Sequence, residues 1–527
     1  MCANLEDIVK DVEIQVVGDR YQVSGRLQWE VNVCQTEAPH QMGREVDRMG
    51  QAVKRQVYRA VLQQVDEEIV GQWQLANPQW QKRGRRPYTF ITPFGRVAMQ
   101  RRRLRNTADG SWQVPSQKVW QTPHRQCIVQ GLREETCDRL RDLSVRETRD
   151  SLAKEADTEQ LLANATVLKI LHQEGSRLVN AQRERAEETL QQHPSALAQG
   201  LATLPPDDER DDNADSEEKV EPGSSRCEEE AALSPQEEQE VWQRAVGFMK
   251  PSEDHSVCAQ GVETVDAGGE QPGPRQADED AVVVQVDEVK TKAQACCEGK
   301  ENWTYTGYVH TGERRYYLVE ASAEQLWRVL AALLCTLGVL QGAKRLLLIA
   351  DGARWIGNWF AGVKLPGKEM ILCWFHLAKK VYEQLSGAGL GKERRATVER
   401  EVLHYLWHGE LAKALWLLWG AREQARSPQK ITELIRYLLR RRDQLPNYAV
   451  RHEAGLMITS NRVEKWNDWA VSERCKRRGM SWTPDGVLSL AVFEAARRNQ
   501  ELDTWRRTSE LPAHEHHDAS SFYAQAA

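Results

Sequence analysis

The sequence predicts an α/β domain in the C-terminal half, built on a five-stranded mixed sheet with helices and interrupted by a helical insertion. It also predicts a mainly α-helical N-terminal region that contains one β-hairpin. From residue 281 onward, short apolar runs alternate with longer helical patterns, as strands and helices do in an α/β domain. Before residue 197, helical spacing of apolar residues prevails, and a Pro-Phe-Gly turn separates two β-rich runs.

Composition divides the chain of 527 residues into five parts, which is compatible with several domains. The middle part is acidic and rich in Pro and Gly, so we expect a disordered linker there, because such a segment cannot build a core. The parts are an N-terminal helical region (1–80), a basic hairpin and helical region (81–196), the linker (197–280), the α/β domain (281–510, with its helical insertion at about 386–450) and a disordered tail (511–527).

Charge is segregated along the chain, although the net charge is only −6. Residues 82–125 carry eleven basic side chains and one acidic side chain, whereas 207–240 carry fifteen acidic and three basic side chains. The net charge therefore does not exclude a polyanionic partner such as duplex DNA.

The basic hairpin has two interpretations that charge density alone leaves open. Its arginines are typical of a solvated edge strand that deters strand pairing, and equally of a ribbon that contacts DNA phosphates. The candidate DNA-binding residues here are Arg85, Arg86, Arg96, Arg101, Arg103 and Arg105.

The helices after the hairpin predict a helix, a turn and a second helix. We expect the first at about 145–156, a break at Asp157 and Thr158, and the last at 164–174, closed by Gly175. A helix-turn-helix would present Thr166 and Lys169 to the major groove of DNA, but an ordinary three-helix bundle has a similar pattern and is the simpler interpretation.

In the α/β domain we expect three strands, a helix, a strand, a helix and a strand. The first strand, 282–286, ends at Asp287, and the fourth, 345–350, delivers Asp351. This order is that of an RNase H-like core, in which the first and fourth strands are neighbours, so two residues 64 positions apart would meet at one sheet edge. Strands two and three are expected at 305–310 and 315–320, and strand five at 370–374.

Asp287, Asp351 and Glu464 are the candidate catalytic and metal-binding residues. Glu464 lies near the start of a predicted helix, after Ser460 or Asn461 as the N-cap. Strand parity favours Asp287 over its neighbour Glu288, because Val283, Gln285 and Asp287 share one face. Hard oxygen ligands suit two Mg²⁺ or Mn²⁺ ions, which can activate a water or a 3′-hydroxyl at a phosphodiester. Cations that follow Glu464 are candidate DNA contacts, namely Arg474, Lys476 and Arg477.

The cysteines predict neither a disulfide framework nor a structural zinc site. One Cys-x-x-His is present, Cys373 to His376, but no second Cys/His pair accompanies it. The start of the chain has no secretory-signal pattern, and the apolar stretch 326–340 contains Arg328 and predicts a buried helix rather than a membrane span.

Several short segments resemble bacterial insertion-sequence transposases with a DDE catalytic core. They are 349–356 (IADGARWI), 374–377 (WFHL), 460–465 (SNRVEK), 474–482 (RCKRRGMSW) and the Thr-Pro-Phe-Gly turn at 92–95 before the arginine-rich strand. The resemblance covers most of the chain outside the linker. One departure is that many relatives have Asp where this chain has Cys373.

The resemblance implies that Asp287, Asp351 and Glu464 are a catalytic triad. It implies metal-dependent cleavage at inverted-repeat ends, followed by transfer of the new 3′-hydroxyl to target DNA, by a homo-oligomer assembled on DNA in the bacterial cytoplasm at the nucleoid. Two alternatives stay open: an RNase H-like nuclease without strand transfer, and a catalytically silent DNA-binding protein derived from a transposase.

Overall fold

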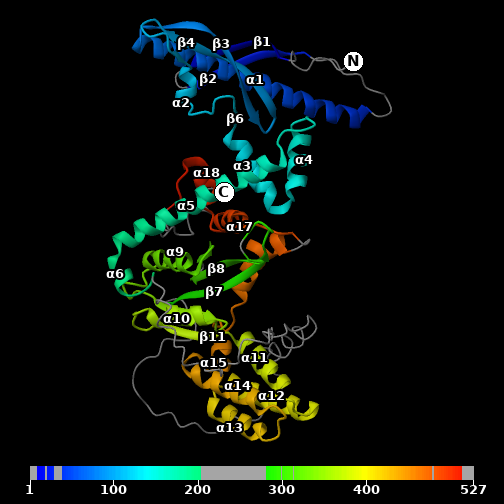
Figure 1. Ribbon diagram of the computed structural model, residues 1–527, viewed down its shortest axis with the longest axis vertical. Helices are drawn as coiled ribbons and strands as arrows, with labels where there is room; N and C mark the ends of the chain where they lie inside the picture. Colours follow the sequence, from blue (N-terminus) through cyan, green and yellow to red (C-terminus); the bar gives the residue numbers. More distant parts are fainter. Residues whose placement is uncertain are drawn as a thin grey trace. The chain divides into compact units, whose positions relative to one another are not determined.

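A computed structural model describes residues 9–17, 20–28, 38–202, 281–297, 299–312, 314–476 and 480–512 (Figure 1). The chain forms two compact units, Met1–Ser176 and Arg177–Ala527. Most of the predicted linker, 203–280, and most of the predicted tail, 513–527, lie outside the described residues. No helix in the described ranges has the length and apolar character that crossing a membrane requires.

The first unit begins with a hairpin that the sequence prediction missed. Strands β1 (Val9–Val17) and β2 (Arg20–Leu27) pair antiparallel, so the prediction that 1–80 is helical is wrong for this part. The alternation of Val12 and Ile14 with polar neighbours is the period-two signal of a strand. The predicted helix follows as α1 (Ala38–Ala76), which is longer than expected at both ends.

The predicted basic hairpin is confirmed and belongs to a four-stranded sheet with the order β5-β4-β3-β6. The turn at Pro93 and Phe94 joins its two long antiparallel strands. Tyr88, Phe90, Val97 and Met99 form the buried face of the hairpin, against which Tyr58 of α1 packs. The strands are β3 (Trp80–Thr92), β4 (Gly95–Asn106), β5 (Trp112–Gln113) and β6 (Gln126–Ile128), and α2 (Pro115–Val119) lies between the last two.

The helix, break and helix after the hairpin are confirmed, but the last helix does not end at Gly175. Asp157 has a φ of 50°, which interrupts the helical path where the break was predicted. Gly175 is buried within the next helix, which continues because its buried residues keep helical spacing through Leu178, Ala186 and Leu190. The helices are α3 (Gln130–Asp142), α4 (Val145–Glu155) and α5 (Asn164–Gln192).

The second unit is an α/β structure around a mixed five-stranded sheet, as predicted. Its strand order is β11-β10-β7-β8-β9, in which β7, β10 and β11 run parallel and β8 and β9 complete an antiparallel meander. Strands β7, β8 and β11 are labelled in Figure 1. The elements are β7 (Ala281–Lys292), β8 (Glu301–Thr311), β9 (Arg314–Glu320), α9 (Ala323–Thr336), β10 (Arg345–Ala350), α10 (Arg354–Gly362), β11 (Glu369–Leu372) and α11 (Trp374–Gly387).

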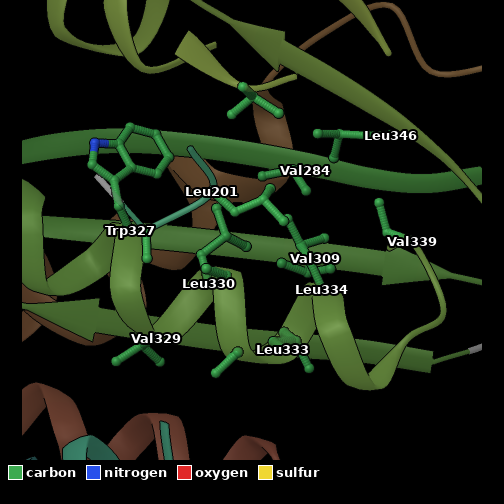
Figure 2. Packing of buried hydrophobic residues seen from close by; sticks show 14 of the residues in the cluster. Leu201, Val284, Val309, Trp327, Val329, Leu330, Leu333, Leu334, Val339 and Leu346 are labelled. Carbon is green, nitrogen blue, oxygen red and sulfur yellow. The ribbon is translucent and has the colours of Figure 1, made fainter. Parts of the chain in front are cut away.

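Each face of this sheet is covered by its own apolar layer. Val284 and Leu346 face the layer around Trp327 and Leu330 of α9, as Figure 2 shows, and Leu201 packs in the same layer. Helix α6 (Pro194–Ala198) and the residues up to Ala202 therefore belong to this core, so the predicted linker boundary at 197 comes too early. Val283, Leu347 and Ile349 face the opposite layer, which α11 and the insertion supply.

The insertion is helical, as predicted, and the chain then returns to the sheet. A π-helical stretch directly follows the helix that carries Glu464. The insertion helices are α12 (Lys392–Trp407), α13 (Leu411–Arg422), α14 (Pro428–Arg440) and α15 (Tyr448–Glu453), and the later elements are α16 (Asn461–Asn467), η5 (Asp468–Lys476), α17 (Pro484–Arg498) and α18 (Leu502–Thr508).

Candidate functional site

Asp287 on β7 and Asp351 directly after β10 lie close together, because the two strands are parallel neighbours. Ile349 of β10 is opposite Gln285 of β7, so two further residues along each strand bring Asp351 opposite Asp287. Asp351 directly follows β10, as expected. Asp287 does not end its strand, however, because β7 continues to Lys292 through its pairing with β8.

Glu464 reaches the same region from α16. Ser460 precedes that helix, but its hydroxyl donates a hydrogen bond to Glu464 Oε1 at 3.0 Å instead of capping the backbone. His376 Nδ1 lies 3.9 Å from the same carboxylate oxygen. Glu464 is about one-third exposed, so one side of its carboxylate is open to solvent.

The electrostatics of Asp287 indicate that negative charge is concentrated here. The pKa of Asp287 is raised to about 7, chiefly by burial and in smaller part by the carboxylates of Asp351 and Glu464, against the lowering effects of the Glu288 N–H and His376. The Glu288 amide donates to Asp287 Oδ1 at 2.8 Å. A divalent cation would relieve this repulsion, because it favours the ionised form of each carboxylate.

A set of buried polar side chains that were not among the predicted site residues positions Asp287 and α16. Asn467 Nδ2 donates to Asp287 Oδ2 at 2.6 Å, and the Thr306 hydroxyl donates to Asn467 Oδ1 at 2.5 Å. Gln285, fully buried, donates to the Thr459 carbonyl at 3.1 Å and accepts from the Val463 N–H at 3.1 Å. The one available signal was a Gln within a valine run, on the same strand face as Asp287.

The loop after Asp351 is held in a conformation that favours glycine. Asp351 Oδ1 accepts from the Ala353 N–H at 2.8 Å, and Gly352 has a φ of 97°. Arg441, just after α14 of the insertion, donates to the Gly352 carbonyl at 2.5 Å. The insertion thus stabilises the loop that presents Asp351.

Cys373 and His376 also lie close to Glu464. The backbone of Cys373 donates to the Ala350 carbonyl at 2.7 Å, and its buried thiol accepts from the Ser460 N–H at 3.3 Å. Burial lowers the pKa of His376, but Cys373, Glu464 and Asp351 outweigh it and raise that pKa to about 9. Burial conversely raises the pKa of the Cys373 thiol, and His376 and Ser460 outweigh it and lower that pKa.

A basic pocket lies beside the distal end of β7. Lys290, Lys292 and Lys300 line it together with Lys476, a predicted DNA contact. Glu301 also lines this pocket and pairs with Lys290 at 3.2 Å, which offsets part of its positive charge. Arg474, also a predicted DNA contact, stacks over the Trp482 ring at 4.9 Å. Arg477 lies outside the described residues.

The selected arginines of the hairpin fall into two groups. Arg85, Arg96 and Arg105 are exposed, and Arg86 and Arg103 are half-buried. Arg101 is 2% exposed, its guanidinium lies 3.4 Å from the centre of the Tyr88 ring, and it donates to Thr122, so its selection as a DNA contact is wrong. Strand parity was the signal, because Arg101 shares the face of Val97 and Met99.

Ion pairs with α1 offset part of the positive charge of the hairpin. Glu67 pairs with Arg102 at 2.5 Å, with Lys82 at 3.5 Å and with Arg85 at 3.5 Å. On α5, Lys169 is exposed and Thr166 is half-buried. Among the described residues of the hairpin, fewer cations are therefore available to a polyanion than the number of basic residues in the sequence suggested.

The part of the chain that carries the carboxylates has a match among known families. Residues 276–510 match the model of the Uncharacterised protein family (UPF0236). No curated protein matches the chain. The match begins just before β7 and extends past α18, so it contains Asp287, Asp351, Glu464 and the basic pocket.

Proposed function

We propose that this chain is a DNA transposase whose second unit is an RNase H-like DDE core. The observation that carries the proposal is that Asp287 on β7 and Asp351 directly after the adjacent parallel strand β10 lie close together, with Asp351 and Glu464 both close enough to raise the pKa of Asp287. The sequence resemblance to insertion-sequence transposases supports the same assignment. The strand order β11-β10-β7-β8-β9, with three antiparallel strands followed by two parallel ones, is the order expected for such a core.

Asp287, Asp351 and Glu464 would hold two Mg²⁺ or Mn²⁺ ions. Their oxygen donors fit such hard cations, and the repulsion among them is what a cation relieves. When bound, the ions supply activation of the attacking hydroxyl and stabilisation of the leaving oxygen. Asn467 holds Asp287 Oδ2 in place, and Gln285 fixes the start of α16, so Glu464 is presented from a rigid element.

Contacts to DNA would come from both units. The lysines beside β7 suit the phosphates of a strand entering the carboxylate site, and the exposed arginines of the hairpin suit phosphates of a duplex. Hydrolysis at a transposon end and attack of the freed 3′-hydroxyl on target DNA are both in-line displacements at phosphorus, so one site serves both steps. We expect the active form to be a homo-oligomer on paired DNA ends.

Replacing Glu464 tests the proposal. Glu464→Gln keeps the shape but removes the charge that a cation needs, so Mg²⁺-dependent cleavage of DNA carrying the inverted repeats that flank the gene should fall by at least about 100-fold. DNA binding in a gel-shift assay should not change. The matched control is Glu473→Gln, an exposed carboxylate on η5, which should cleave normally.

The outcomes separate the alternatives. Normal cleavage by Glu464→Gln would remove this carboxylate from the site. Cleavage by the wild-type chain without joining to target DNA would indicate a nuclease. Binding without Mg²⁺- or Mn²⁺-dependent cleavage would indicate a silent DNA-binding protein.

A further inference from the structure

Cys373, His376 and Glu464 form a second group of metal-ligand side chains beside the carboxylates. Their donor atoms all lie within 4.8 Å of one another. Cys373 follows β11, and His376 is in the first turn of α11, so a Cys-x-x-His spacing places both at one helix start. Glu464 comes from α16, 88 residues after His376, which is why the sequence offered no third ligand.

One residue orients two of these ligands. Ser460 donates its backbone N–H to Cys373 Sγ at 3.3 Å and its hydroxyl to Glu464 Oε1 at 3.0 Å. Hydrogen bonds of this kind orient ligands in metal sites. His376 Nδ1 is a buried nitrogen for which the described part of the chain provides no well-formed hydrogen bond. That nitrogen faces Glu464 Oε1 at 3.9 Å.

The donor set favours a different metal from the one that three carboxylates favour. A thiolate, an imidazole and a carboxylate select zinc and similar transition metals, whereas Mg²⁺ prefers oxygen ligands throughout. Around a tetrahedral zinc ion, such donors lie about 3.3–3.9 Å apart, so only a small closing of the three side chains is needed.

A nucleophilic role for Cys373 agrees less well with the structure. Its side chain is fully buried, whereas reactive cysteines are partly exposed to their substrates. A buried thiol can still bind a metal ion that enters beside His376 and Glu464, whose side chains are each about one-third exposed.

We propose that Cys373 Sγ, His376 Nδ1 and Glu464 Oε1 bind one zinc-class transition-metal ion and leave a fourth coordination position open. This site is distinct from the all-oxygen site but shares Glu464 with it. Zinc and Mg²⁺ therefore compete for Glu464. That competition rests on the proposed function, whereas binding of the transition metal does not.

Cobalt spectroscopy of the full chain, freed of metal by a chelator and without DNA, tests the binding. Co²⁺ should give a thiolate-to-cobalt absorption band at one ion per chain, and Zn²⁺ should displace it. Cys373→Ser should abolish the band. His376→Gln and Glu464→Gln keep the thiol, and each should weaken Co²⁺ binding by about 100-fold or more, beyond the 10–100-fold that loss of an outer partner costs.

Two controls keep the assignment specific. Cys475→Ser removes a buried free cysteine on η5, and a Cys296→Ser, Cys297→Ser double variant removes a neighbouring pair that is partly exposed. Both should keep the band unchanged.

Survival of the band in Cys373→Ser, its loss in the double variant, or unaltered Co²⁺ affinity in both His376→Gln and Glu464→Gln would overturn the proposal. If Cys373→Ser does not fold, as circular dichroism would show, the other two variants decide. This experiment measures metal binding in the absence of DNA. A negative result in the cleavage assay would therefore not change its outcome.

Discussion

At the scale of single residues, Asn467 is a side chain that orients the Asp287 carboxylate. It is buried, donates to Asp287 Oδ2 and accepts from Thr306, so it fixes the orientation of the Asp287 carboxylate. Partners of this kind contribute to metal affinity without touching the metal.

Asn467→Ala should therefore raise the Mg²⁺ concentration needed for half-maximal DNA cleavage by about 10–100-fold, with partial rescue at high Mg²⁺. The measurement is a Mg²⁺ titration of the cleavage rate. Asp468→Asn, at the exposed next position, is the control and should not shift the titration. An unaltered Mg²⁺ requirement in Asn467→Ala would mean that the Asn467–Asp287 hydrogen bond is not functional.

Asp66 of α1 is a buried carboxylate whose ionisation disfavours the folded state. Burial raises its pKa, although the Arg102 N–H, which donates to Asp66 Oδ2 at 2.9 Å, opposes the change. Because the folded pKa lies above the unfolded one, the contribution of Asp66 to stability is complete below the unfolded pKa. It is lost as the pH rises through the folded pKa.

Asp66→Asn should thus stabilise the first unit at about pH 8 but not at about pH 4, since the amide keeps an acceptor for Arg102 and carries no charge. Hydrogen exchange of the β3 and β4 amides at the two pH values would measure this. Asp47→Asn, exposed on the same helix, should have no effect at either. Equal stabilisation at both pH values would show that ionisation is not the cause.

At the scale of elements, the second half of α5 is attached to the α/β unit by ion pairs. Arg183 donates to both oxygens of Glu320 at the end of β9, at 3.2 and 2.6 Å, and the Glu320 side chain is fully buried. Arg185 pairs with Glu501 at 2.7 Å. This part of α5 is highly charged, and its partners lie 137 and 316 positions away, so no local pattern in the sequence indicates them.

Arg183→Met should leave the Glu320 carboxylate buried and unpaired. Loss of a buried partner costs 3–5 kcal/mol, and because Arg183 is one-third exposed we expect about 2–3 kcal/mol here. Denaturant unfolding of the full chain would measure this loss as a change in the unfolding transition of the second unit. Glu184→Gln, exposed on the same turn, is the control. A loss no larger than in this control would mean that solvent replaces the arginine.

At the scale of the whole molecule, the basic side chains of the hairpin divide into cations that are exposed and cations that are paired or buried. Glu67 pairs with three cations of the hairpin, and Arg101 stacks inside it, so fewer cations are free for DNA than the sequence contains. Binding of duplex DNA by the remaining cations should depend steeply on salt, because each phosphate contact releases counterions.

The full chain should lose affinity for duplex DNA steeply between low and physiological salt. Arg105→Ala should reduce the slope of log K against log salt by about 0.9, as loss of one phosphate contact does. Arg101→Ala should leave that slope unchanged and instead lower the thermal stability of the first unit, since it removes a buried cation–π contact. Fluorescence anisotropy at several salt concentrations would distinguish the two variants. Salt-insensitive binding would refute a phosphate-based interface.

Local patterns were sufficient to predict many of the elements. Apolar runs predicted the strands of the mixed sheet, and the Pro-Phe-Gly turn predicted the hairpin, because these signals lie within a few residues of one another. Errors occurred where a local rule competes with packing. Gly175 does not end its helix because the buried residues beyond it keep helical spacing, and β7 does not end at Asp287 because β8 pairs with it as far as Lys292.

The sequence by itself determined which carboxylates could act together, because their order along the chain carries that information. Only the tertiary structure decided what surrounds them. Asn467, Gln285 and the Cys373–His376 pair reach the site through contacts spanning up to 180 positions. The local periodicity of the sequence carries no information about contacts between residues so far apart. The same holds for Arg101, whose charge predicted a solvent-facing role. Its burial follows from the rings of Tyr88, on the paired strand β3, and Trp120, directly after α2, which lie over its guanidinium.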